Sequence, residues 1–175
     1  LQKYKYYMGV DLGGRRIIKK KNVVHEEGGV IVLDWMDIIP GRGLEYSDIR
    51  LDLIKNIARW KPIWVVPDST GMGDPICEQM EKDIRELRLK NLTVTVGTQP
   101  RTRTETIQQC RKLPTKVYSN KKNHKGFVFD NVSKPELIDN LQTTFSQNLI
   151  EIPTENTYKI GTLWEELRSE EHTSE

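Results

Sequence analysis

The segment Val65-Val66-Pro67-Asp68-Ser69-Thr70-Gly71-Met72-Gly73-Asp74-Pro75 contains most of the information about the fold of this chain. It begins as a buried apolar strand, places Asp68 where that strand ends, and continues through a glycine-rich turn into a helix. Asp74 is expected to cap this helix. Pro75 suits the first helical position, because an N–H there would have no hydrogen-bond partner within the helix. A strand, an acidic residue, a glycine turn and a helix in this order are typical of an α/β sheet.

A second strand-end aspartate lies near the N-terminus, where the aromatic and branched segment Tyr6–Asp11 precedes Gly13-Gly14. Sites in α/β sheets lie at the carboxyl ends of strands, so the carboxylates of Asp11 and Asp68 are expected to converge. Two such groups repel each other unless one is protonated or a cation binds between them. Oxygen ligands without nearby His or Cys favour Mg²⁺ or Mn²⁺, and two such ions can assist phosphodiester cleavage. Asp11 and Asp68 are therefore the predicted catalytic residues and metal ligands; the residues alone leave open a turn cap at Asp68 and a salt bridge at Asp11.

The spacing of apolar residues predicts the remaining elements. In chain order these are strands at about 15–25 and 30–39, a helix at 47–60 capped by Ser47, a strand at 62–66, the helix from Asp74, strands at 92–96 and 126–129, a helix at 134–147 with a Ser133–Glu136 capping box, a strand at 149–152 and a possible helix start at 162–167. The lysines of 15–25 suggest an edge strand. Together the elements predict an α/β protein whose mixed sheet has an antiparallel meander followed by crossover helices.

The charge of the chain is unevenly distributed. The net charge is +2, yet residues 98–125 contain eight basic residues against Glu105 alone, a local charge of +7. A basic block on a near-neutral domain indicates a polyanion such as DNA, although a solvated insertion would have the same composition. The predicted DNA-binding residues are Arg101, Arg103, Arg111, Lys112, Lys121, Lys122 and Lys125.

Composition excludes several classes of protein. The 175 residues suit one domain, and no apolar run approaches the roughly 18 residues that a membrane span requires. Cys77 and Cys110 form no CxxC pattern, so neither a zinc site nor a disulfide framework is implied, and a reducing compartment is expected. The sequence also lacks the P-loop motif of many ATPases.

Four stretches resemble the C-terminal nuclease domain of large terminase subunits, the DNA-packaging motors of tailed bacteriophages. They are GVDLG at 9–13, PGRGLEYSDIRLDLI at 40–54, VVPDSTGMGDPICEQM at 65–80 and SKPELIDNLQTTFSQNLIEIP at 133–153. The resemblance extends over about residues 5–165. It implies a ribonuclease H-like fold and metal-dependent cleavage of double-stranded DNA, with Asp11 and Asp68 as the first two acidic ligands of a two-metal site.

The chain departs from this family at its C-terminal end. The family's third acidic motif has no counterpart, because Glu165 and Glu166 lack its context. We therefore expect a nuclease domain at 1–167, truncated near Leu167, with an incomplete active site and a basic insertion at about 98–125. In the family, the region that corresponds to this basic insertion can form a hairpin that faces DNA. Residues 168–175, RSEEHTSE, resemble one reading frame of a sequencing adapter and are expected to be a non-native tail.

The resemblance also implies partners: double-stranded DNA, an upstream ATPase domain of the same chain, a portal and a small terminase subunit, in the host cytoplasm and without a membrane. Two other interpretations stay open. Residues 9–14, GVDLGG, resemble the phosphate loop of sugar kinases, which would make this an ATP-binding domain, although a second phosphate loop is missing. A non-catalytic DNA-binding module would explain the absent third acidic motif.

Overall fold

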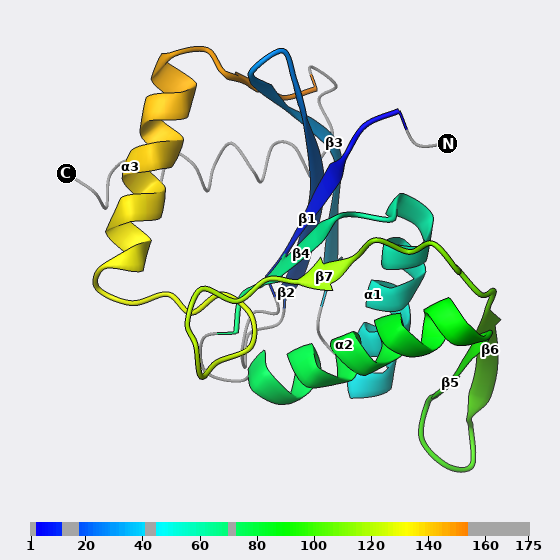
Figure 1. Cartoon of the computed structure of the whole chain (residues 1–175). Helices are drawn as coiled ribbons and strands as arrows, with labels where there is room; N and C mark the ends of the chain where they lie inside the picture. The colour runs from blue at the N-terminus through cyan, green and yellow to red at the C-terminus, as the bar shows by residue number, and fades with distance from the viewer. Residues whose placement is uncertain (1–2, 12–17, 41–44, 70–72, 154–175) are drawn as a thin grey trace.

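The computed structural model describes residues 3–11, 18–40, 45–69 and 73–153 (Figure 1). These residues form a six-stranded sheet in the order β7-β4-β1-β2-β3-β8, a two-stranded sheet of β5 and β6, and helices on both sides of the larger sheet. In chain order the elements are β1 Tyr6–Asp11, β2 Ile18–Glu27, β3 Val30–Pro40, α1 Tyr46–Trp60, β4 Trp64–Pro67, α2 Gly73–Leu89, β5 Leu92–Val96, β6 Arg103–Ile107, β7 Lys116–Val117, α3 Ser133–Ser146 and β8 Ile150–Glu151.

The predicted meander and crossovers are both present. β1, β2 and β3 pair antiparallel in succession, with a turn at Gly28-Gly29 between the last two. α1 then returns the chain so that β4 pairs parallel to β1, and β7 pairs parallel to β4 after α2. The mixed α/β sheet expected from the sequence is confirmed. The expectation of an edge strand at 15–25 is wrong, because β2 lies between β1 and β3.

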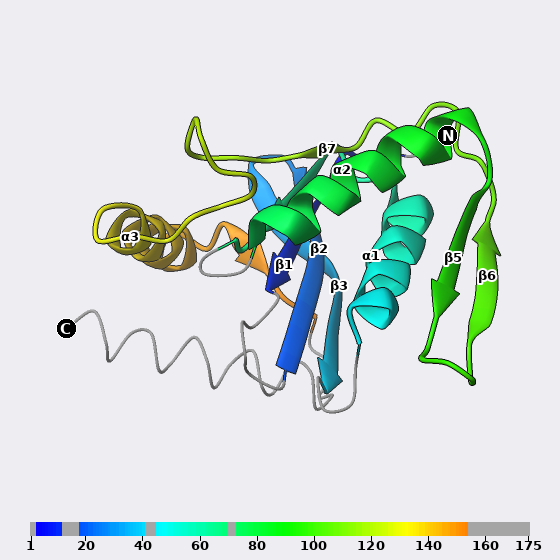
Figure 2. The same cartoon turned by 90° about the horizontal axis from the view of Figure 1, so that it is seen from below.

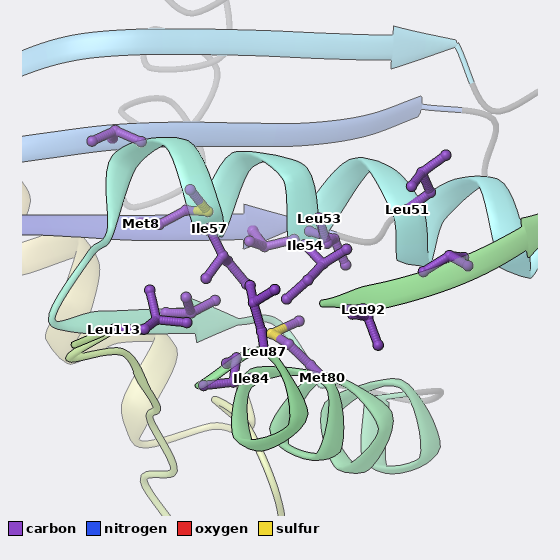
Figure 3. Close-up of a cluster of buried hydrophobic side chains, with 14 of the residues drawn as sticks. Met8, Leu51, Leu53, Ile54, Ile57, Met80, Ile84, Leu87, Leu92 and Leu113 are labelled. Atoms are coloured by element: carbon purple, nitrogen blue, oxygen red, sulfur yellow. The ribbon is translucent and has the colours of Figure 1, made fainter. Parts of the chain in front are cut away.

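The core lies between the sheet and the two helices α1 and α2, which cover the same side of it (Figures 1 and 2). The close-up in Figure 3 shows side chains of both helices meeting over β1 and β4. The buried residues recur at helical spacing: Leu53, Ile54 and Ile57 in α1, and Met80, Ile84 and Leu87 in α2. Each fully buried side chain of this size stabilises the fold by about 1.5–3 kcal/mol.

The segment 92–107 forms a hairpin of its own. The strand predicted at 92–96 exists, but it pairs antiparallel with β6, a strand for which the basic stretch gave no periodic signal. The place next to β4 in the main sheet is occupied by the two-residue strand β7. At 126–129 the expected strand reduces to a single bridge between Asp68 and Phe127. The predicted helix at 162–167 and the expected tail lie outside the described residues.

Helix starts differ from the expected caps. α1 begins at Tyr46, and the carboxylate of Asp48 accepts a bond from the Glu45 N–H at 3.0 Å, whereas the buried Oγ of Ser47 has no hydrogen-bond partner. α2 begins at Gly73, one residue before the expected cap at Asp74.

At the start of α3 the cap is again different from the predicted Ser133–Glu136 box. The carboxylate of Asp130 accepts bonds from the N–H groups of Val132 and Ser133 at 2.9 and 2.8 Å. The hydroxyl of Ser133 donates instead to the carbonyl of Val128 at 3.0 Å. An aspartate outside the predicted box therefore satisfies the first N–H groups of this helix.

A buried histidine joins β2 to β3. His25 is 4% exposed; its Nδ1 lies 2.6 Å from Asp34 Oδ2 and its Nε2 lies 3.3 Å from Glu27 Oε2. The ring also stacks on Tyr4, with 4.1 Å between centroids. The hydrogen bond to Asp34 raises the pKa of His25, although burial opposes the shift.

This raised pKa predicts how stability changes with pH. A group whose pKa is higher in the folded state stabilises fully below its unfolded pKa of about 6.5, and this contribution is lost as pH rises through the folded pKa. The free energy of unfolding should therefore fall as pH rises from about 6.5 through the raised pKa of His25. Urea unfolding at a series of pH values measures this, and His25→Gln should flatten the profile. An equally steep profile in the variant would contradict the assignment.

Candidate active site

The two predicted aspartates end neighbouring parallel strands. In the β1–β4 pair the last register partners are Val10 and Pro67, and the Asp68 N–H donates to the Val10 carbonyl at 2.8 Å. Asp11 and Asp68 each follow directly, at equivalent positions on strands that lie about 4.8 Å apart. The structure thus places the two residues side by side at the carboxyl edge of the sheet, as the strand-end pattern predicted.

Both aspartates line one cleft of about 710 Å³. Asp11 is exposed and Asp68 is half-buried, so carboxylate oxygens are accessible from the cleft. The polar part of the lining also includes Lys20 and Asn22 of β2. The apolar part comes from the sheet, from the segment after β7 and from α3: Tyr7, Val10, Met36, Trp64, Val66, Tyr118, Phe127, Phe129 and Leu137.

The backbone around Asp68 is held by the segment that returns after β7. Phe127 donates its N–H to the Pro67 carbonyl at 2.7 Å, and Ser69 donates to the Phe127 carbonyl at 2.9 Å. Gly126, with φ +80°, permits this approach, because a Cβ there would lie 2.9 Å from the Pro67 carbonyl oxygen. Hydrogen bonds on both sides of Asp68 therefore fix the position of its backbone.

The donor set at this edge is two carboxylates, whose hard oxygens fit Mg²⁺ or Mn²⁺. Within the ranges that the structure describes, no three His, Cys, Asp or Glu side chains form a group that could hold a metal ion. Asp11 and Asp68 alone thus supply fewer ligands than such an ion usually takes from a protein and its substrate.

Three of the predicted DNA-binding residues lie on the loop that follows β7. Lys121, Lys122 and Lys125 are exposed on the loop 119–125, which leaves the carboxyl end of β7, next to β4. Lys121 forms an ion pair with Asp130, and Lys125 Nζ lies 3.4 Å from Glu81 Oε1. The bond from Lys121, with the backbone N–H groups of Ser133 and Val132, lowers the pKa of Asp130. We call residues 119–125 the basic loop.

The other four basic residues lie elsewhere. Arg101 and Arg103 belong to the β5–β6 hairpin, and Arg111 and Lys112 follow it; all four are exposed. In both Figure 1 and Figure 2 the hairpin lies at the far end of α2 from the basic loop. The structure therefore divides the predicted basic region into two separate surfaces.

Lys21 also contributes to the cleft lining, but Lys20 is the charged residue beside Asp11 that the sequence pattern did not indicate. It is the register partner of Asp11 in the β1–β2 pair. The signal was available in the alternation of β2, but an uninterrupted lysine run obscured which lysine faces the aspartates.

No protein-family model matches the sequence, and no curated protein does. Several solved structures are similar in fold. The large terminase nuclease of thermophilic phage G20c, crystallised with bound magnesium, aligns over 96% of this chain and 65% of its own, at 17% identity and a TM-score of 0.59. The chain has the fold of a large terminase nuclease domain. The HK97 bacteriophage large terminase aligns over 89% of this chain and 31% of its own, at 13% identity and a TM-score of 0.50.

These alignments agree with the ribonuclease H-like fold expected from the sequence. The chain spans 65% of the G20c nuclease and 31% of the HK97 terminase, so the likeness concerns the nuclease fold. Among the described helices, none has the length and apolar character needed to cross a membrane.

Proposed function

We propose that this chain is the nuclease domain of a phage large terminase and hydrolyses double-stranded DNA during genome packaging. The observation that carries the proposal is the placement of Asp11 and Asp68 side by side at the edge of one cleft. The fold supports it, because a nuclease of this fold has been crystallised with magnesium.

Asp11 and Asp68 would hold Mg²⁺ or Mn²⁺ through their carboxylate oxygens. A bound divalent cation supplies a nucleophilic hydroxide at neutral pH and neutralises charge on the phosphate, and a pair of ions can act on both reacting oxygens. The chain itself contributes fixed positions for the two carboxylates, because the Asp68 backbone is tied to β1. The basic loop would hold the DNA backbone beside them through charged contacts that do not depend on sequence.

We propose that further acidic ligands of this centre come from outside the described residues. A complete two-metal site would then need more ligands than Asp11 and Asp68 provide. An upstream ATPase domain, a portal and a small terminase subunit would be its partners in the host cytoplasm. A non-catalytic DNA-binding module is the second candidate, favoured by the absence of a third metal-ligating side chain near the aspartates within the described ranges.

Mn²⁺ titration of the chain, followed by cleavage of supercoiled plasmid with Mg²⁺ or Mn²⁺, tests the proposal. Mn²⁺ binding that depends on both aspartates supports the nuclease; DNA binding without Mn²⁺ binding supports the non-catalytic module. Saturable ATP binding would favour the sugar-kinase-like interpretation.

The two basic surfaces predict different effects on DNA binding. Replacing Lys122 by glutamine should weaken binding of a DNA duplex severalfold and lower the slope of log K against log salt by about one. Arg101→Gln makes the same charge change in the hairpin, away from the cleft, and should have a smaller effect. Fluorescence anisotropy at several salt concentrations measures both. A larger loss in the hairpin variant would move the DNA path to that surface.

A further inference from the structure

Three consecutive lysines, at 19–21, follow Ile18 at the start of strand β2, and successive side chains of a strand point to opposite faces. Lys21 points into the protein: it is 2% exposed, forms an ion pair with Asp52 of α1, and its Nζ lies 3.5 Å from Asp37 Oδ2. Lys20 therefore faces the other side, where it is half-buried; both lysines contribute to the lining of the cleft.

The sheet register places Lys20 next to the two aspartates. β4, β1 and β2 are consecutive strands, and Asp68, Asp11 and Lys20 lie at matching positions across them. Lys20 is the direct cross-strand partner of Asp11, and the Cβ atoms of such partners lie about 4.5–5.5 Å apart. The ammonium group of this long side chain can therefore reach both the Asp11 carboxylate and an anion above it.

We propose that Lys20 is a third charged group of this centre, which binds a phosphate of the DNA backbone and opposes cation binding at Asp11. The inference rests on the proposed function. Asp11 and Asp68 together carry two negative charges, and Lys20 offsets one of them before any cation arrives. An ammonium is a compact point charge that suits phosphate, whereas a divalent cation at the same carboxylate would experience its repulsion.

The proposal predicts two effects of opposite sign for Lys20→Gln. Mn²⁺ alone should bind the variant about tenfold more tightly, because a like charge has been removed beside the ion. A short DNA duplex, measured with EDTA present, should bind about threefold more weakly. A lysine that merely pairs with Asp11 would change Mn²⁺ affinity and leave DNA affinity intact, and a residue that merely supports the fold would weaken both.

Lys5→Gln is the matched control, since Lys5 is exposed beside the opposite end of β1 and the charge change is the same. Lys20→Arg keeps the charge and should keep both affinities near those of the original chain, which separates loss of charge from loss of folding. Unchanged DNA affinity or weaker Mn²⁺ binding in Lys20→Gln would overturn the inference.

The Asp68→Asn variant distinguishes an error in the role of Lys20 from an error in the proposed function. If Mn²⁺ binding depends on Asp68 while Lys20→Gln has no effect, only the inference about Lys20 is lost. If Mn²⁺ binds neither the original chain nor Lys20→Gln, both are overturned.

Discussion

Replacing Asp68 by asparagine should weaken Mn²⁺ binding at the carboxyl edge by at least about 100-fold and reduce any DNA cleavage at least as much. The magnitude follows because even outer partners of metal ligands typically contribute 10–100-fold in affinity, and Asp68 would be a direct ligand. The substitution keeps the shape of the side chain and removes its charge. The backbone bond to Val10 that holds this position stays available.

Titration monitored by Mn²⁺ electron paramagnetic resonance measures the affinity, and plasmid nicking measures the cleavage. Asp139→Asn is a suitable control, because Asp139 is an exposed carboxylate of α3. The stability of both variants should stay within about 0.5 kcal/mol of the original chain, as for surface changes elsewhere. Undiminished Mn²⁺ binding in Asp68→Asn would remove this residue from the centre.

The second large effect concerns the ion pair between α1 and α2. Asp83 is 1% exposed and accepts two bonds from the Arg50 guanidinium, both at 2.7 Å, and one from the Gln79 amide at 2.9 Å. Asp83→Ala should lower the free energy of unfolding by about 3–5 kcal/mol, because it removes one partner of a buried pair. Urea denaturation measures this change.

A double variant separates the pair from the packing around it. Arg50→Met combined with Asp83→Leu removes both charges and replaces them with apolar groups, an exchange that is often neutral or stabilising when the pair is buried. It should therefore recover much of the stability lost in Asp83→Ala. Asp139→Ala, at an exposed position, should change stability by less than about 0.5 kcal/mol. A small effect of Asp83→Ala would mean that water already reaches this carboxylate.

The sequence predicted the aspartate pair because the relevant signal is local. Each aspartate follows an apolar strand and precedes glycines, and parallel pairing then brings strand ends to one edge. α1 and α2 were also predictable, since their buried residues recur at helical spacing over about four turns.

Other features depend on contacts that no local pattern encodes. The pairing of β5 with β6 instead of the main sheet depends on contacts between segments, and β7 is too short to give a periodic signal. The side of the sheet to which Lys20 points could not be predicted, because residues 19–21 are all lysine and show no alternation of polar and apolar residues. The burial of Lys21 becomes understandable only with Asp37 and Asp52 in place beside it.

The helix α3 has no buried residue, although Leu137 contributes to the wall of the cleft. Its melting would therefore expose little new apolar area, and local opening costs least where burial is least. The side of the candidate cleft that α3 forms can consequently loosen while the core between α1, α2 and the sheet stays intact. Under the proposed function, entry of a DNA duplex into the cleft would depend on α3, whereas global unfolding depends on the core between α1, α2 and the sheet.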